Sequence, residues 1–339
     1  MPNPLEALLA EKGLLLADGA TGTTLFAMGL ESGEAPELWN ETFPDRIRAL
    51  HDGFIEAGAD IILTNSFGGT RHRLKLHHAQ DRVHELNRLA AQIARSAADA
   101  AGRKVIVAGS VGPTGELLEP LGAMTYDEAV DAFAEQIEGL KAGGADVAWI
   151  ETMSAPQEIR AAAEAAIRVG LPYTFTASFD TAGRTMMGLA PGDIHGVAEG
   201  LDALPAGIGA NCGVGASDIL ASLLDMSAAN SQTTLIVKGN CGIPQFQGTE
   251  IHYSGTPELM ADYVRLAVDS GARIIGGCCG TSHQHLAAMR AALDTHVKAD
   301  RPTVDEITAR IGPLRNKQAK DSGTAPDASG RRERRRSRS

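Results

Sequence analysis

Short apolar runs alternate with amphipathic stretches along most of the chain. The runs share a length of four or five residues and lie at 14–17, 60–64, 104–108, 146–150, 173–177, 207–210, 234–237 and 273–277. Each is nearly continuous in apolar character, which is typical of parallel strands buried on both faces. The pattern therefore predicts an α/β fold of eight strands, each followed by a helix.

The segments between the runs carry the marks of helices. Thr125 and Glu128 match a capping box, and apolar residues follow at positions 130, 133, 137 and 140. After the last run, Ser282 is placed to cap a helix whose apolar face is formed by positions 286, 289 and 293. Proline suits the first turn of a helix, so four more helices are expected to begin near Pro44, Pro156, Pro191 and Pro257.

Eight strand and helix alternations predict a single closed (β/α)8 TIM barrel, with an open doubly wound sheet as the alternative. We assign the barrel to residues 1–300. Residues 301–339 form a C-terminal extension that is expected to be disordered and basic from about residue 316. The segment after Thr70, rich in Arg, His and Lys, is expected to be a solvated helix face.

Composition and charge narrow the class of protein. The chain has 339 residues, 43% of them apolar, and four cysteines, too few for a disulfide-stapled secreted scaffold. No charged-then-apolar signal segment and no apolar run of about 18 residues is present, so we expect a soluble, cytoplasmic protein with no membrane partner. The net charge is -11; residues 316–339 carry eight basic and three acidic residues (+5), which leaves -16 on the rest and argues against nucleic acid as a partner of the barrel.

Three of the four cysteines lie where strands of the predicted barrel end. Cys212 follows the sixth apolar run, and Cys278 and Cys279 follow the eighth. In a parallel barrel these ends meet at one rim, and three thiolates can bind zinc while leaving a fourth position for water or substrate. Cys241 is a possible fourth ligand, and its neighbour Asn240 is a candidate for a weak, labile oxygen ligand.

Such a ligand set narrows the chemistry. Zinc with three thiolates has a net charge of -1, so it activates water poorly but can hold a substrate thiol deprotonated for attack on an alkyl group. We predict thiol alkylation with no catalytic side chain beyond the metal site. The alternatives are a zinc-binding docking subunit without catalysis and a zinc hydrolase using Glu151 as base, which the sulfur ligands disfavour.

Other residues at the predicted rim could hold the substrate. Glu151 could accept an ammonium group, and backbone N–H groups around Gly19 and Ala20 could bind a carboxylate. Asp18 is a second candidate for the ammonium group or for orienting the loop that follows it.

Taken together, these segments resemble the homocysteine S-methyltransferase family. The resemblance covers residues 10–297 and rests on residues 18–23, 57–60, 64–67, 112–116, 151–152, 211–212 and 276–281. It implies a (β/α)8 barrel in which zinc, held by Cys212, Cys278 and Cys279, binds the homocysteine thiolate for methylation to methionine. It also implies that Asp18, the backbone after it and Glu151 hold the amino-acid end.

The methyl donor differs among branches of this family. Residues 64–73 and 112–122 look most like the cobalamin-dependent branch, and the chain lacks room for that branch's folate, cobalamin and reactivation modules. We therefore expect a methylcorrinoid on a separate protein, with separate corrinoid or folate subunits. Betaine is the second possibility, although Gly68 and Thr152 stand where that branch has tyrosines and only Trp39 remains for an aromatic cage. S-methylmethionine is the third.

Overall fold

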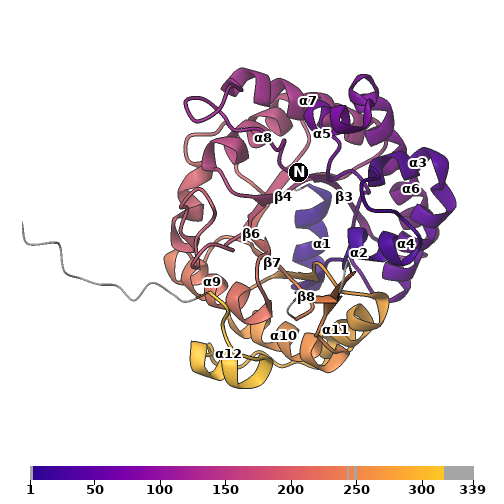
Figure 1. Ribbon diagram of the computed structural model, residues 1–339. Coiled ribbons are helices and arrows are strands. Elements are labelled where there is room, and N and C mark those ends of the chain that lie inside the picture. Colours follow the sequence, from indigo (N-terminus) through magenta and orange to yellow (C-terminus); the bar gives the residue numbers. More distant parts are fainter. Residues whose placement is uncertain (1–2, 243, 248–249, 317–339) are drawn as a thin grey trace, which may run out of the picture.

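The computed structural model describes residues 3–242, 244–247 and 250–316, and its core is a closed parallel barrel (Figure 1). Its strands are β1 (Leu15–Leu16), β2 (Ile61–Leu63), β3 (Ile106–Val111), β4 (Val147–Met153), β5 (Tyr173–Ala177), β6 (Gly207–Cys212), β7 (Leu235–Gly239) and β10 (Ile274–Gly277). They pair in the order β1-β10-β7-β6-β5-β4-β3-β2, and a parallel bridge from Ala17 to Ile61 joins the two ends. The predicted TIM barrel is confirmed, and the open sheet is wrong.

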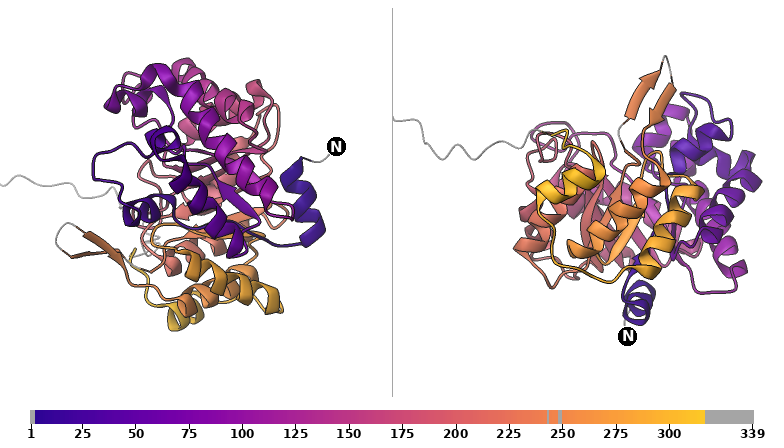
Figure 2. Two further views of the ribbon diagram at one scale, coloured as in Figure 1. Left: turned by 90° about the vertical axis from the view of Figure 1, so that its right-hand side faces the viewer. Right: turned by 90° about the horizontal axis from the view of Figure 1, so that it is seen from below.

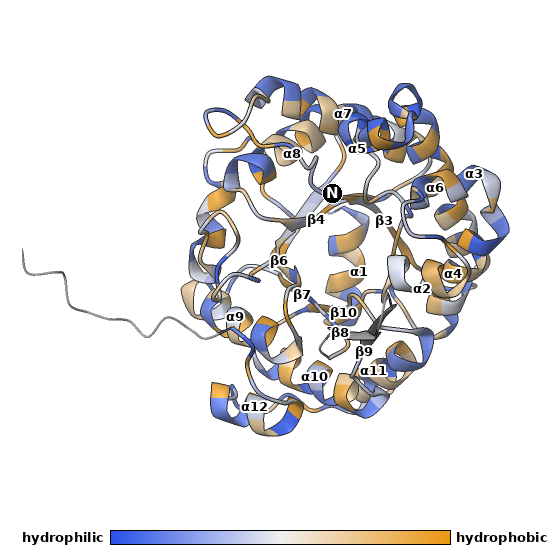
Figure 3. Cartoon of the chain, in the orientation of Figure 1, coloured by the Kyte–Doolittle hydropathy of each residue, from blue (hydrophilic) through white to orange (hydrophobic). Residues whose placement is uncertain are grey.

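Helices surround the barrel with their apolar sides inward (Figure 3). The main ones are α2 (Thr21–Ala27), α4 (Pro44–Glu56), α6 (Val83–Ala100), α7 (Tyr126–Ala142), α8 (Pro156–Val169), α9 (Ala216–Ala229), α10 (Pro257–Asp269) and α11 (His283–Thr295). The predicted capping box at Thr125 is present at the start of α7. The helix expected at Pro191 is instead a 3-10 helix, η4 (Pro191–Ala198), in which Gly192 and Gly196 weaken α-helix propensity.

Short helical pieces fill the connections after β1 and β2. They are η1 (Pro36–Leu38), α3 (Trp39–Thr42), α5 (Arg71–Leu74), η2 (Lys75–His77) and η3 (Gln80–Arg82). The segment after Thr70 is largely solvated, as expected, but Arg73 and His77 within it line the cavity described below.

An N-terminal helix, α1 (Pro4–Lys12), covers the amino end of the barrel (Figure 2). Its Leu5, Leu8 and Leu9 are buried against the inward-facing strand residues, among them Trp149. This helix was not predicted, although Asn3 and Glu6 form a capping box around Pro4. The barrel interior is thus packed and closed at this end.

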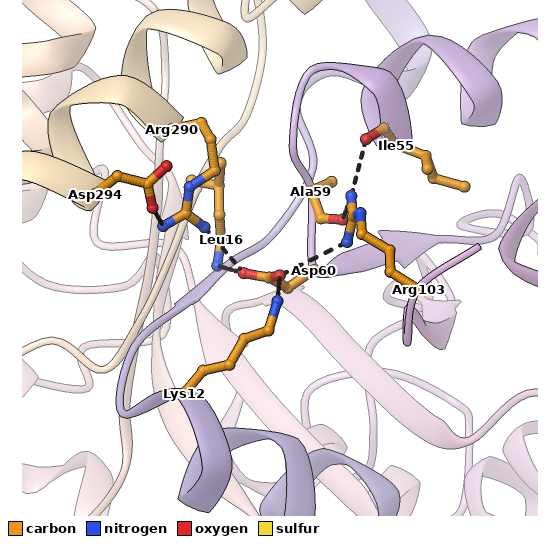
Figure 4. A network of polar contacts seen from close by, with 8 residues as sticks. All are labelled: Lys12, Leu16, Ile55, Ala59, Asp60, Arg103, Arg290 and Asp294. Carbon is orange, nitrogen blue, oxygen red and sulfur yellow. Dashed lines mark hydrogen bonds and ion pairs between the residues drawn. The ribbon is translucent and has the colours of Figure 1, made fainter. Parts of the chain in front are cut away.

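A buried charge cluster fastens the same end (Figure 4). Asp60, 1% exposed, pairs with Lys12 at 2.6 Å, with Arg290 at 3.1 Å and with Arg103 at 3.7 Å, and it accepts the Leu16 N–H at 3.0 Å. Helices α1 and α11 and the turn after α6 are thereby tied to the start of β2.

Two further elements extend the barrel. A hairpin of β8 (Pro244–Gln247) and β9 (Glu250–Tyr253), inserted between β7 and α10, projects from the end opposite α1 (Figure 2). Helix α12 (Val304–Ile311), within the predicted C-terminal extension, contacts α9 and α10. The predicted basic, disordered tail follows residue 316 and lies outside the described residues. No helix in the described part of the chain is long and apolar enough to cross a membrane.

Candidate metal and substrate site

Three cysteines converge at the carboxyl end of the barrel. The Sγ atoms of Cys212, at the end of β6, and of Cys278 and Cys279, just after β10, all lie within 4.8 Å of one another. The sulfurs of a tetrahedral zinc site with Zn–S distances of about 2.3 Å would lie about 3.8 Å apart. The cluster is therefore the right size for one zinc ion and three thiolates.

Local backbone geometry points Cys212 into this cluster. Its φ of 62° lies in the left-handed region, which is uncommon for a residue with a side chain and marks strain at functional sites. The Asn240 Nδ2 group lies 3.8 Å from Cys212 Sγ and donates to the Gly213 carbonyl at 2.8 Å, while its Oδ1 accepts the Cys279 N–H at 3.1 Å. The Asn240 oxygen is thus engaged with backbone, and its nitrogen faces the Cys212 sulfur.

The crowded thiols resist ionisation on their own. The hydrogen bond with Cys278, that residue's charge and burial raise the pKa of Cys212 to about 12. The hydrogen bond with Cys212 together with burial raises the pKa of Cys279 to about 11. Three thiolates this close need a cation among them, which is the charge pattern of a metal site.

Two neighbours complete the surroundings of the thiols. Cys241 is buried outside the three-sulfur cluster, and burial raises its pKa to about 12. Its N–H donates to the Cys279 carbonyl at 2.9 Å, so it supports the loop through its backbone. Tyr253, which the sequence analysis missed, packs its ring against Gly280, and burial followed by the charge of Cys279 raises its pKa.

Below the thiols, two carboxylates flank a buried lysine. Lys238 on β7 donates from Nζ to Asp18 Oδ1 at 2.7 Å, and Asp18 Oδ2 accepts the Leu63 N–H at 2.7 Å. Burial raises the pKa of Asp18 and of Glu151, while the Lys238 charge opposes the rise. Burial lowers the pKa of Lys238, but the two carboxylates outweigh it and hold that pKa above its ordinary value. Asp18 is thus the ion-pair partner of Lys238.

Glu151, in contrast, lines the cavity with one oxygen lightly engaged. Its Oε1 accepts the Ser110 hydroxyl at 2.5 Å, and its Oε2 lies 3.4 Å from Asn211 Nδ2. It is aimed by a bulge in β4, where Thr152 has a φ of 60°. Asn211 Oδ1 accepts the Thr152 N–H at 2.7 Å and the Thr176 hydroxyl at 2.6 Å, so Asn211 holds this bulge in place.

The loop after β1 is fixed by backbone contacts. A Cβ on Gly19 would lie 2.4 Å from the Thr281 carbonyl oxygen, so only glycine fits there. The Ala20 N–H donates to that same oxygen at 3.0 Å. Of the predicted carboxylate-binding backbone, the Ala20 amide is therefore already paired, and the first turn of α2 follows directly.

A cavity of about 350 Å³ connects these groups. Its lining includes Cys212, Cys278, Cys279, Glu151, Lys238, residues 19–23, Glu34, Glu37, Phe67, Arg73 and His77. Phe67 is the one aromatic residue among its described lining. Trp39 is instead 3% exposed and packs against Phe43 and Arg46, so it is not placed as a cage wall.

The fold and the site together define a TIM barrel with three clustered thiols and a charged cavity at its carboxyl rim. A sequence model of the family described as homocysteine S-methyltransferase matches residues 15–293, and the chain belongs to that family. It is 30% identical over 321 residues to methionine synthase of Mycobacterium tuberculosis, covering 88% of this chain but 26% of that protein. It is likewise 30% identical over 300 residues to methionine synthase of Mycobacterium leprae, covering 83% of this chain and 24% of that protein. The chain thus spans about a quarter of these relatives.

Solved structures agree with this membership. The homocysteine methyltransferase MmuM of Escherichia coli superposes with a TM-score of 0.72 in its oxidized form and 0.71 in its metallated form, at 27% identity in each case. The oxidized form covers 86% of this chain and 99% of the E. coli chain. The likeness therefore extends over the whole barrel.

Proposed function

We propose that this protein is a zinc-dependent homocysteine S-methyltransferase that forms methionine. The observation that carries the proposal is the meeting of Cys212, Cys278 and Cys279 within 4.8 Å on the wall of a cavity that also contains Glu151. Zinc held by the three thiolates would supply a site that keeps an incoming thiol deprotonated near neutral pH while leaving electron density on its sulfur.

The side chains around the cavity bind and orient the substrate. Glu151 accepts the substrate ammonium group, and Asn211 and Ser110 hold the Glu151 carboxylate in position. Asn240 fixes the direction of the Cys212 sulfur and the Cys279 backbone. The nucleophile is the substrate sulfur itself, so no side chain has to move a proton during methyl transfer.

The donor we propose is a methylcorrinoid carried on a separate protein. The resemblance of residues 64–73 and 112–122 to the cobalamin-dependent branch supports it. The cavity supports betaine less well, because Phe67 alone among its described lining offers an aromatic face.

Two measurements test the proposal. Homocysteine titrated calorimetrically into zinc-loaded protein should bind with proton release, and absence of binding would favour a docking subunit. Changing Cys212, Cys278 or Cys279 singly to Ala should lower zinc stoichiometry, whereas Cys241→Ala, the matched control, should retain it.

The donor is tested by supplying methylcobalamin, betaine and S-methylmethionine separately with homocysteine. Methionine should form with methylcobalamin. Methionine formed from betaine or S-methylmethionine alone would replace the corrinoid donor while leaving homocysteine methylation in place.

A further inference from the structure

We infer that the Tyr253 hydroxyl donates a hydrogen bond to the Cys279 sulfur of the proposed zinc site and so protects this ligand from methylation. The inference rests on the proposed function and adds a positioning residue, which acts through Cys279 and does not contact the substrate. A zinc ion with three cysteine thiolates and a substrate thiolate would present four sulfurs to the methyl donor. Productive transfer requires the substrate sulfur to be the most nucleophilic of the four.

Tyr253 lies against the segment that carries the two neighbouring cysteines. Its ring covers Gly280, the residue after Cys279, because a Cβ on Gly280 would lie 2.3 Å from Tyr253 Cγ and 2.5 Å from Tyr253 Cβ. The phenol and Cys279 are hydrogen-bonding partners. Tyr253 is not among the described residues that line the cavity, so it contacts the ligand and not the substrate space.

Backbone contacts hold Tyr253 in this position. Strand β9 ends at Tyr253, and two residues later the Gly255 N–H donates to the Cys241 carbonyl at 3.0 Å. The Cys241 N–H in turn donates to the Cys279 carbonyl at 2.9 Å. Gly255 allows this approach, because a Cβ there would lie 2.6 Å from Cys241 Sγ. The tyrosine and Cys279 are thus linked through the backbone of one loop.

The direction of the hydrogen bond follows from the chemistry of the two groups. A thiolate bound to a metal carries no proton, so its sulfur can only accept, and the phenol O–H is the donor. A hydrogen bond to an ionised acceptor is stronger than one between neutral groups. It stabilises the charge on the sulfur, and a thiolate stabilised in this way is a weaker nucleophile.

The other two cysteines have polar neighbours of their own. Asn240 Nδ2 lies 3.8 Å from Cys212 Sγ, and Cys278 interacts with the positive charge of Lys238. Each protein sulfur therefore has a different stabilising group. Removal of the Tyr253 hydroxyl should then affect Cys279 and leave the other two sulfurs as they are.

The test treats zinc-loaded protein with iodomethane in the absence of homocysteine and maps the methylated cysteines by peptide mass spectrometry. In each event the cysteine sulfur supplies the electron pair of the new S–CH3 bond, the C–I bond breaks, and iodide leaves. A charge-assisted hydrogen bond changes an equilibrium roughly tenfold to a hundredfold, and thiolate nucleophilicity follows about 0.4–0.5 of that change on a logarithmic scale. Tyr253→Phe should therefore speed methylation of Cys279 roughly threefold to tenfold, and methylation of Cys212 and Cys278 by less than about twofold.

Tyr173→Phe is the matched control. Its hydroxyl also makes one hydrogen bond, to the Ala203 carbonyl at 2.8 Å, and Tyr173 is the first residue of β5, at the end of the strand away from the thiols. This variant should leave the methylation rates of all three cysteines unchanged. A second readout is the thiolate-to-metal charge-transfer band of cobalt(II)-loaded protein. The band should move to longer wavelength in Tyr253→Phe, because the sulfur lone pairs rise in energy when the hydrogen bond is lost.

The outcomes are distinct. Equal acceleration at all three cysteines would overturn the inference, since easier access to the site predicts it. An unchanged rate at Cys279, an unshifted cobalt band or loss of zinc from Tyr253→Phe would overturn it as well, and each of these results would leave homocysteine methylation by the wild type standing. A wild-type protein that binds no zinc would refute the proposed function and this inference together.

Discussion

Asn211 connects the strained segments of the site, so replacing it tests how the site is built. Its side chain is 1% exposed and accepts from the Thr152 N–H and the Thr176 hydroxyl. It also donates to Thr152 Oγ1 at 2.7 Å and, over 3.4 Å, to Glu151 Oε2. Asn211→Ala removes all four contacts and leaves the Thr152 N–H and the Thr176 hydroxyl without this acceptor.

The expected cost follows from those two donors. A buried polar group left unsatisfied costs about 1–3 kcal/mol, and water can reach half-buried Thr152 more easily than fully buried Thr176. We therefore expect Asn211→Ala to lower the free energy of unfolding by about 3 kcal/mol.

The assay is urea unfolding of metal-free protein, followed by the fluorescence of the two buried tryptophans, Trp39 and Trp149. Asn211→Asp is the matched variant, because it keeps the acceptor but places a second carboxylate beside Glu151. A carboxylate whose pKa is raised in the folded state binds protons better when folded, so the deficit of Asn211→Asp should shrink as pH falls from 7 toward 5. A loss below about 1 kcal/mol in Asn211→Ala would refute the view that this side chain holds the bulge.

Three other perturbations have defined outcomes. Since the raised pKa values keep the cysteine thiols protonated at neutral pH without a cation, zinc binding should release protons. The affinity of the protein for zinc, measured by chelator competition, should therefore rise from pH 6 to pH 8. An affinity that does not change with pH would contradict this. Burial lowers the pKa of His51 to about 4, so protonation of His51 favours the unfolded state. Between about pH 6.5 and pH 4, the free energy of unfolding of the wild type should fall by roughly 3 kcal/mol more than that of His51→Leu. An equal pH dependence of the two free energies, measured by urea unfolding, would contradict this. Asp60→Ala should lower the free energy of unfolding by about 3 kcal/mol, because it leaves buried cations unpaired. Lys12→Met should lower it by less than about 1 kcal/mol, since Lys12 is partly exposed and Asp60 keeps its two arginines. Equal losses in urea unfolding would show that the stability comes from the pair with Lys12.

Repetition made the fold predictable. Eight apolar runs gave the strands, because strands buried on both faces must be apolar throughout. The run at 207–210 was too short by two residues: β6 continues to Cys212, and polar Asn211 belongs to the strand because its amide is paired inside the barrel. The hairpin of β8 and β9 has no such repeat and was not predicted.

The site was predictable only where one residue type carries the chemistry. Three cysteines at strand ends indicated that their sulfurs would meet, and the structure brings these sulfurs together. Lys238 was missed because its burial depends on Asp18, which lies 220 residues away in the chain. The commitment of Asp18 to Lys238 was unpredictable for the same reason, since a pairing between distant residues leaves no local pattern.

The helix that covers the amino end of the barrel has a kinetic consequence. With the leucines of α1 filling that end, the cavity is reached from the opposite rim, where the thiols lie. Under the proposed function, a thiol held beside Glu151 must bind before a donor that covers this rim and must leave after that donor. Methyl transfer should then require binding of the thiol before the methyl donor. Excess donor should inhibit methionine formation, because it occupies the entrance before the thiol has bound.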